Sequence, residues 1–177
     1  MLERHRANME MTSQSSVVVR PIEDSDWGRV FEIFNAVIAE GETYAYPDDL
    51  TSEAARVLWI ERPPAETVVA LRDDVILGTA KFGPNRPARG SHVATASFMV
   101  APGSRGSGVG RAMCEFAIAW ARDHGYAAMQ FNAVVSTNVL AISLYHDLGF
   151  VTIGTVPEAF EHASLGRVGL DIMYLQL

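Results

Sequence analysis

The sequence predicts a mixed α/β fold, and three observations point to it. Short runs rich in β-branched and aromatic residues alternate with longer segments whose apolar residues recur at helical spacing. Glycine and proline separate these segments. The composition, 49% hydrophobic and 20% charged, is typical of a globular protein with a buried core. With 177 residues, the chain has about the length of one domain.

The first part of the chain predicts a flexible tail, one strand and two helices. Residues 1–16 mix charged and polar side chains without an apolar period, so we expect them to form a tail outside a single domain over 17–177. A β-branched run then stops at Pro21, and a helix follows that Asp24 or Asp26 can cap. The expected elements are a strand over 17–20, a helix over 27–38, and a helix that opens at Thr51 and ends before Pro63.

The remainder predicts an antiparallel meander followed by alternating helices and strands. Asp73 and Asp74 separate two β-rich runs and indicate a hairpin. Gly125 and Gly149 mark the ends of two helices. The expected strands cover 67–72, 75–82, 92–100, 128–135, 151–155 and 171–177, and the expected helices cover 111–124 and 138–148.

Charge and cysteine content exclude several classes of function. Fourteen Lys and Arg against 21 Asp and Glu give a net charge of −7, which disfavours binding to nucleic acid or to an anionic membrane. The single Cys114 cannot form an internal disulfide, and no spacing typical of a metal site occurs. Because no signal peptide or long apolar stretch is evident, we expect a cytoplasmic protein.

A glycine-rich turn between a strand and a helix is the most informative segment. Glycines at 106, 108 and 110 allow successive backbone N–H groups to point into one concavity at a helix N-terminus, where an anion is stabilised. Arg105 and Arg111 flank the turn and can add hydrogen bonds to phosphate. The turn lacks the Gly-Lys-Ser/Thr ending of a Walker loop and the glycine spacing of a dinucleotide fingerprint. It therefore predicts an anionic cofactor of another kind.

Two motifs of this sequence resemble those of the GNAT superfamily of N-acetyltransferases. The run RGSGVG (105–110) after a strand ending in FMV (98–100) resembles the acetyl-coenzyme A signature of that superfamily. The run FNAVVSTNVLAISLYHDLGF (131–150) resembles its second motif. The resemblance covers about residues 17–177 and implies a mixed central sheet with splayed fourth and fifth strands and flanking helices.

The same resemblance implies acetyl-CoA as cofactor and gives the residues that bind it. The backbone of the strand before the turn is expected to receive the pantetheine arm and the acetyl oxygen; these residues are Phe98, Met99 and Val100. The phosphates are expected at the turn. The expected ligands there, together with one residue at the start of the next helix, are Arg105, Gly106, Ser107, Gly108, Val109, Gly110, Arg111 and Asn138.

Tyr145 is the candidate general acid. It lies seven residues after Asn138, two helical turns on, and so shares a face with it, whereas Leu140, Leu144 and Leu148 are expected to face the core. A phenol with an ordinary pKa of about 10 can protonate the thiolate of a thiol with a pKa of about 8.5. The resemblance implies the same role. The alternative to a catalytic role is that Tyr145 only packs against the core or the cofactor. The alternative to a cofactor contact is that Asn138 only caps the helix.

The general base and the acceptor site are less well defined. The strand over 92–100 has no carboxylate at its middle, so we expect water to relay the proton from the amine to a distant acid. Side chains that can attract a cationic amine are Glu40, Glu42, Glu158 and His162, the last two in a loop before the final strand. The residues expected at the acceptor are Glu42, Tyr44, Tyr46 and Asn132.

The predicted function is transfer of an acetyl group from acetyl-CoA to the amine of a small molecule. FNAV (131–134) and IGTVPEAF (153–160) resemble branches of the superfamily that act on amino-acid-like compounds, such as the phosphinothricin and proline-analogue acetyltransferases. The alternatives are an N-terminal acetyltransferase of proteins or peptides and a non-catalytic sensor of acyl-coenzyme A. Homodimers are frequent in the superfamily, so the resemblance also implies a possible homodimer.

Overall fold

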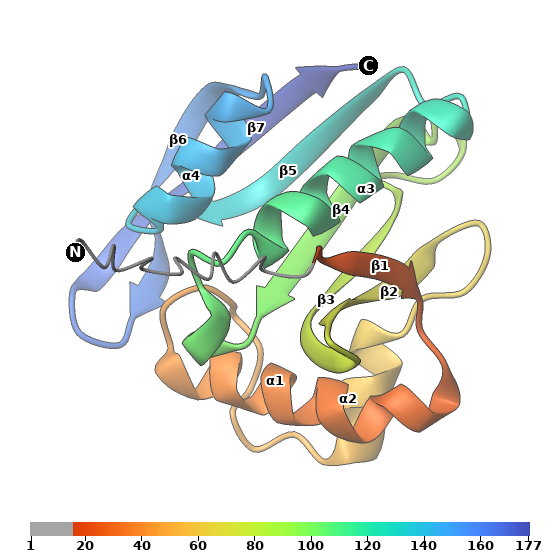
Figure 1. Cartoon of the computed structure of the whole chain (residues 1–177). Helices are drawn as coiled ribbons and strands as arrows, with labels where there is room; N and C mark the ends of the chain where they lie inside the picture. The colour runs from red at the N-terminus through yellow and green to blue at the C-terminus, as the bar shows by residue number, and fades with distance from the viewer. Residues whose placement is uncertain (1–15) are drawn as a thin grey trace, which may run out of the picture.

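The computed structural model describes residues 16–177, and the sheet at its centre has seven strands. The predicted tail over 1–16 lies outside the described residues except for Ser16. The strands are β1 (Val18–Pro21), β2 (Glu66–Arg72), β3 (Val75–Pro84), β4 (Val93–Val100), β5 (Ala128–Val135), β6 (Val151–His162) and β7 (Gly166–Gln176). Their order in the sheet is β1-β2-β3-β4-β5-β7-β6, and only β4 and β5 pair in parallel (Figure 1). The predicted mixed sheet is confirmed.

Within residues 16–177, four α-helices flank the sheet in the order that the sequence predicts. They are α1 (Trp27–Glu40), α2 (Ser52–Trp59), α3 (Val109–Asp123) and α4 (Val139–Asp147). The single-turn 3₁₀ helices of the same range are η1 (Asp24–Asp26), η2 (Ala88–Gly90) and η3 (Pro102–Ser104). In Figure 1, α1 and α2 lie together at one side of the sheet, whereas α3 and α4 cross its other face.

Two hydrophobic cores lie on the two faces of the sheet. Val68 and Ala70 of β2 belong to the core beneath α3, whereas Val69 between them belongs to the core beneath α1 and α2. Successive side chains of a strand point to opposite faces, so this alternation places the two helix pairs on opposite sides. The same rule puts Phe98 of β4 on the α3 side and Met99 on the α1 side.

The ends of α1 and α2 follow from local chemistry. Asp26 precedes α1, but its carboxylate bonds the Glu23 N–H and both terminal nitrogens of Arg20 instead of capping the helix. Gly41 ends α1 in a left-handed conformation with φ of 64°. Thr51 begins α2, and its hydroxyl accepts a hydrogen bond from the Ala54 N–H at 3.2 Å, as the sequence predicts.

The last two strands are much longer than the sequence predicts. Residues 156–162, expected in a loop, extend β6, and β7 begins at Gly166 rather than at 171. Glu158 and His162 therefore lie on a strand, and the register shifts between Val156 and Phe160. At the tip of this hairpin the Ala163 N–H donates to the Gly41 carbonyl at 2.9 Å, so β6 and β7 reach over the end of α1.

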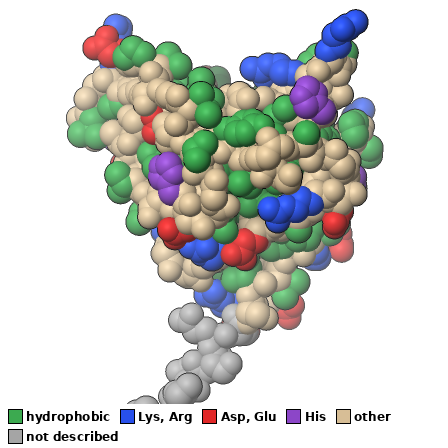
Figure 2. Space-filling view, turned by 90° about the horizontal axis from the view of Figure 1, so that it is seen from above, with side chains coloured by type: hydrophobic (Ala, Val, Ile, Leu, Met, Phe, Trp, Pro, Cys, Tyr) green, Lys and Arg blue, Asp and Glu red, His purple; other side chains and the backbone are tan. Residues whose placement is uncertain are grey.

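One face of the molecule carries its charges in a dispersed pattern. On the face shown in Figure 2, Lys and Arg side chains are scattered among acidic, apolar and polar ones. Among residues 16–177, no helix is both long and apolar enough to cross a bilayer. Within the same range, no group of three or more His, Cys, Asp or Glu side chains is arranged to hold a metal ion.

Candidate active site

The glycine-rich turn forms a concave row of backbone donors at the start of α3. Gly106 and Gly108 have φ of 76° and 87°, a left-handed conformation that side chains with a Cβ rarely adopt. A Cβ placed on either glycine would meet no atom within 4 Å, so the space in front of both is open. The Ala112 N–H bonds the Gly108 carbonyl, whereas the N–H groups of residues 108–111 have no backbone acceptor. Such a helix N-terminus is a binding site for an anion.

Contacts from outside the turn hold it in this shape. The Ser107 hydroxyl donates to the Ser104 carbonyl at 2.6 Å. Arg72, at the end of β2, donates through Nη2 to the Ser107 carbonyl at 2.7 Å. Sequence reasoning missed Arg72, because no local pattern connects it to a loop 35 residues away. These bonds turn carbonyl groups toward the protein and leave the N–H groups for a ligand.

The two arginines beside the turn are already paired with carboxylates. Arg105 forms an ion pair with Glu40 at the end of α1. Arg111 Nη2 lies 2.9 Å from Asp147 Oδ2 at the end of α4. Both guanidinium groups are partly exposed and stay within reach of the turn. Their predicted contacts with phosphate stay predictions, and a phosphate would have to share each arginine with its carboxylate.

Strands β4 and β5 separate beside the turn, which confirms the predicted splay. They pair only at Val93 with Ala128 and at Ala94 with Met129. Beyond Ala94, the edge of β4 that faces β5 has no strand partner, and Figure 1 shows the two strands diverging toward α4. The backbone groups of β4 along this gap have no strand partner, so a ligand can pair with them in the manner of an added strand.

The hydrogen bonds of β4 show which residues face the gap. The Val93 carbonyl accepts from Asn85 N–H, and the Ala101 N–H donates to the Leu77 carbonyl, so odd-numbered residues turn their backbone toward β3. Even-numbered residues, Phe98 and Val100 among them, face the gap. Met99 departs from the prediction for this strand: its backbone faces β3 and its side chain is buried on the α1 side. The gap therefore offers the backbone of Phe98 and Val100.

Tyr145 lies on α4 against the apolar wall of the gap. Its ring centroid is 4.6 Å from that of Phe131, 5.8 Å from Phe150 and 6.2 Å from Phe98. Burial raises the pKa of Tyr145 well above its ordinary value, and no hydrogen bond contributes to the shift. The phenol therefore keeps its proton throughout the neutral range. The raised pKa also makes the phenol a weaker acid, so proton transfer depends on a thiolate whose own pKa is raised beside it.

Helix α4 departs in one respect from the face that its spacing predicts. Asn138 precedes the helix, and its Oδ1 accepts a hydrogen bond from the Ala141 N–H at 3.3 Å, so its capping role is confirmed. Ile142, Tyr145 and Leu148 pack against the core, whereas Leu140, predicted to face it, is 69% exposed. The face of α4 that carries Ile142 and Tyr145 covers the sheet, and Leu140 lies on the exposed side of the helix. A contact between Asn138 and the cofactor stays a prediction.

A cavity of about 450 Å³ lies on the α1 side, between the α1–α2 loop and β6. Tyr44 and Tyr46 line it with their rings parallel at 5.8 Å, and Asp48 and Glu161 add carboxylates. Its remaining lining residues are Ile38, Gly41, Ala45, Pro47, Ala159 and Phe160. The two tyrosines were predicted to contact the acceptor. The sequence did not predict Asp48 or Glu161 at this cavity. Glu161 reaches the loop only because β6 is longer than predicted.

The other residues considered for the acceptor do not line this cavity. Glu42 is exposed beside it. Asn132 bonds Asn85 through Nδ2 at 2.6 Å and accepts from Gln130 at 2.8 Å, so it belongs to a polar cluster on β5. Glu158 is exposed, and buried His162 accepts from the Ser164 N–H at 3.2 Å. The structure therefore brings Tyr44 and Tyr46 together, leaves Glu42 exposed outside the lining, and places Asn132 in a separate cluster.

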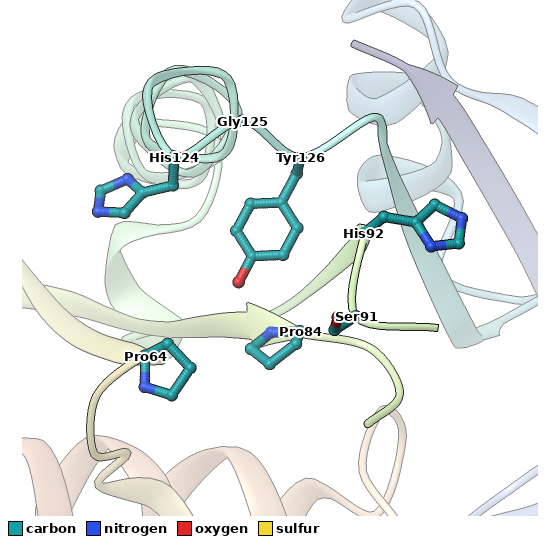
Figure 3. A pocket seen from close by; sticks show the side chains of 7 residues that line it. All are labelled: Pro64, Pro84, Ser91, His92, His124, Gly125 and Tyr126. Carbon is teal, nitrogen blue, oxygen red and sulfur yellow. The ribbon is translucent and has the colours of Figure 1, made fainter. Parts of the chain in front are cut away.

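A second cavity of about 300 Å³ lies at the other end of α3 and β4 (Figure 3). His92 precedes β4 and His124 follows α3, so this cavity is separated from the glycine-rich turn by the length of both elements. Its walls also include Tyr126, and the ring of His124 stacks on Trp120 at 4.3 Å. This cavity has no contact with the gap or with Tyr145.

Comparison with known proteins assigns the fold and the two motifs to one family. The model of the acetyltransferase (GNAT) family matches residues 29–150, which include the glycine-rich turn, the gap and Tyr145. The chain belongs to this family, and the predicted resemblance is confirmed. Membership of this family defines a class of enzyme but not one particular reaction. Individual relatives therefore narrow the comparison.

Three relatives cover nearly the whole chain. The structure of a GCN5-related N-acetyltransferase from Kribbella flavida is 51% identical, with a TM-score of 0.88, and the match covers 91% of this chain and 98% of that one. L-amino acid N-acyltransferase MnaT of Escherichia coli is 30% identical over 164 residues, which cover 90% of this chain and 92% of MnaT. The structure of yncA from Salmonella typhimurium with its cofactor acetyl-CoA is 26% identical, with a TM-score of 0.75 and coverage of 92% and 95%.

Two curated relatives match over a shorter stretch. Protein SPT10 of Saccharomyces cerevisiae is 36% identical over 83 residues, and N-acetyltransferase aca1 of Schizosaccharomyces pombe is 33% identical over 84 residues. These stretches cover about half of this chain, 13% of SPT10 and 40% of aca1.

Proposed function

We propose that this chain is an acetyl-CoA-dependent N-acetyltransferase that acts on the amine of a small molecule, with residues 17–177 as one catalytic unit. The observation that carries the proposal is the arrangement of three features around one gap. The edge of β4 that has no strand partner ends at a row of N–H groups without backbone acceptors, and Tyr145 lies against the wall of the same gap. This arrangement suits a long donor with a phosphate end and a reactive thioester end.

The residues present fit acetyl-CoA. The N–H groups of residues 108–111 would hold its pyrophosphate, and the open space before Gly106 and Gly108 leaves room for it. The backbone of Phe98 and Val100 would hold the pantetheine arm, and Asn138 lies at the start of α4 beside the gap. Bound there, acetyl-CoA supplies an acetyl group activated as a thioester.

The chain's own groups then perform three tasks. A backbone N–H of β4 stabilises negative charge on the acetyl oxygen as the amine attacks. Tyr145 gives its hydroxyl proton to the departing thiolate sulfur. Water relays the proton of the amine to a distant carboxylate, because the residues at the middle of β4, Thr95 to Ser97, carry none.

The cavity between the α1–α2 loop and β6 supports a small acceptor. The β6–β7 tip lies against the α1–α2 loop through the bond between Ala163 and Gly41, and the cavity of about 450 Å³ beside it has the volume of a small-molecule site. The net charge of −7, and the scattered Lys and Arg side chains on the face shown in Figure 2, disfavour nucleic acid as a partner. The amino-acid substrates named for MnaT support an amino-acid-like acceptor. A sensor without catalysis has no use for a proton donor such as the phenol of Tyr145.

Location and assembly are part of the same proposal. We infer a cytoplasmic enzyme, because the one cysteine is buried and unpaired, as is usual in a reducing compartment. The exposed apolar side chains of the outermost strand, Val151, Ile153 and Val156, support a homodimer.

The test is an assay of thiol release from acetyl-CoA over a panel of amino acids, their analogues, polyamines and short peptides. We expect turnover with small amines and none with peptides. Turnover restricted to peptides would reverse the choice of acceptor. Tight binding of acetyl-CoA without turnover on any amine would favour the sensor.

A further inference from the structure

Tyr44 connects the cavity on the α1 side to the gap between β4 and β5. It lines the cavity with its ring, and its hydroxyl reaches the edge of β4. The hydroxyl donates to the Phe98 carbonyl at 2.7 Å and accepts from the Phe98 N–H at 3.0 Å. The Tyr44 side chain therefore bonds both the N–H and the carbonyl of Phe98, which in a continuous sheet would pair with a neighbouring strand.

Packing around the ring fixes where the hydroxyl lies. Tyr44 stacks on Tyr46, and its ring meets Trp59 edge-on at 6.1 Å. Trp59 is fully buried, and Phe34 of α1 stacks on the other side of Tyr46 at 5.6 Å. Burial raises the pKa of Tyr44, so the hydroxyl is a neutral donor at physiological pH. Contact with Phe98 is thus built into the aromatic core of α1 and α2.

Phe98 is also the residue at which the thioester is needed. Its ring lies 6.2 Å from that of Tyr145, and a general acid must come within about 3 Å of the atom that it protonates. The thioester therefore lies beside Phe98 when Tyr145 acts. The peptide N–H and carbonyl of Phe98 point into the gap, and both are engaged by Tyr44.

We propose that the Tyr44 hydroxyl and the acyl-pantetheine arm compete for the N–H and carbonyl of Phe98. Binding of the thioester then displaces the Tyr44 side chain and reshapes the acceptor cavity that this side chain lines. This inference rests on the proposed function. It makes Tyr44 a positioning residue that couples the two substrate sites, and by linkage each substrate changes the affinity for the other.

The first test uses Tyr44→Phe with two ligands. Acetyl-CoA needs both the turn and Phe98, whereas 3′-phosphoadenosine 5′-diphosphate has the phosphates without the arm and needs only the turn. We expect Tyr44→Phe to bind acetyl-CoA about 3- to 30-fold tighter than the wild type by calorimetry, because the competitor is gone. Binding of the nucleotide should not change. Tyr126→Phe, the same substitution in the distant cavity, serves as the matched control for both ligands.

The second test uses the wild-type protein and needs no variant. Because Trp59 contacts Tyr44, displacement of Tyr44 should change tryptophan emission when acetyl-CoA binds, and the nucleotide should leave it unchanged. Unchanged or weaker binding of acetyl-CoA to Tyr44→Phe, with the nucleotide still bound, would overturn the competition. If acetyl-CoA leaves the tryptophan emission of the wild type unchanged, the competition is also overturned. This second result does not depend on whether the variant folds. If the wild type binds neither ligand, the proposed function itself fails.

Discussion

Removal of the Tyr145 hydroxyl tests the chemical step directly. In Tyr145→Phe the ring keeps its contacts with Phe131, Phe150 and Phe98, and the lost hydroxyl leaves no protein group without a hydrogen bond. We therefore expect the free energy of unfolding to change by less than about 0.5 kcal/mol. The kcat should fall about 10- to 1,000-fold, because the thiolate loses its proton donor, whereas the Kd for acetyl-CoA should stay nearly the same.

The assay is steady-state thiol release together with calorimetric binding of acetyl-CoA. Tyr126→Phe is the control, since Tyr126 is also a phenol whose pKa burial raises but lies in the cavity at the far end of α3. Because burial raises the pKa of Tyr145, its ionisation should cause no loss of wild-type activity below about pH 10. Turnover by Tyr145→Phe equal to that of the wild type would refute its role as acid.

Three further predictions concern the turn, an ion pair and the thiol. Gly108→Val forces a side chain into a left-handed conformation and should weaken acetyl-CoA binding at least tenfold, whereas Gly103→Val, in η3 with open space and no positive φ, should not. Arg20 lowers the pKa of Asp26, so Asp26→Asn should cost about 1–2 kcal/mol of unfolding free energy at pH 7 in urea melts. That cost should shrink as the pH falls below the ordinary range of an Asp carboxyl and through its lowered native pKa, where the wild-type carboxylate becomes protonated; a constant cost would contradict the pairing. Burial raises the pKa of Cys114 to about 12, so maleimide at pH 7 should label it only after denaturation.

The order of the elements and the glycine-rich turn could be predicted because both depend on local pattern. Apolar periodicity sets the helices, and the left-handed backbone at Gly106 and Gly108 requires glycine. The β6–β7 hairpin was predicted too short for the same reason. Pro157 and Gly154 interrupt the alternation that marks a strand, yet an outer strand with a shifted register tolerates both.

The parts of the site that the sequence missed depend on contacts between distant residues. Tyr44 was predicted to contact the acceptor, but its bonds to Phe98 join residues 54 positions apart. The bond from Arg72 to Ser107 also crosses elements. Leu140 was placed in the core by spacing alone, although which face of a short helix packs on the sheet is decided by tertiary packing.

The ion pairs beside the glycine-rich turn determine how the site responds to ionic strength. Glu40 neutralises Arg105, and Asp147 neutralises Arg111, so the rim of the turn has little net charge. Attraction for a polyanion then comes from oriented peptide dipoles at short range, not from a long-range positive field that salt screens. A donor captured in this way keeps most of its affinity in concentrated electrolyte, in contrast to a ligand held on a basic surface.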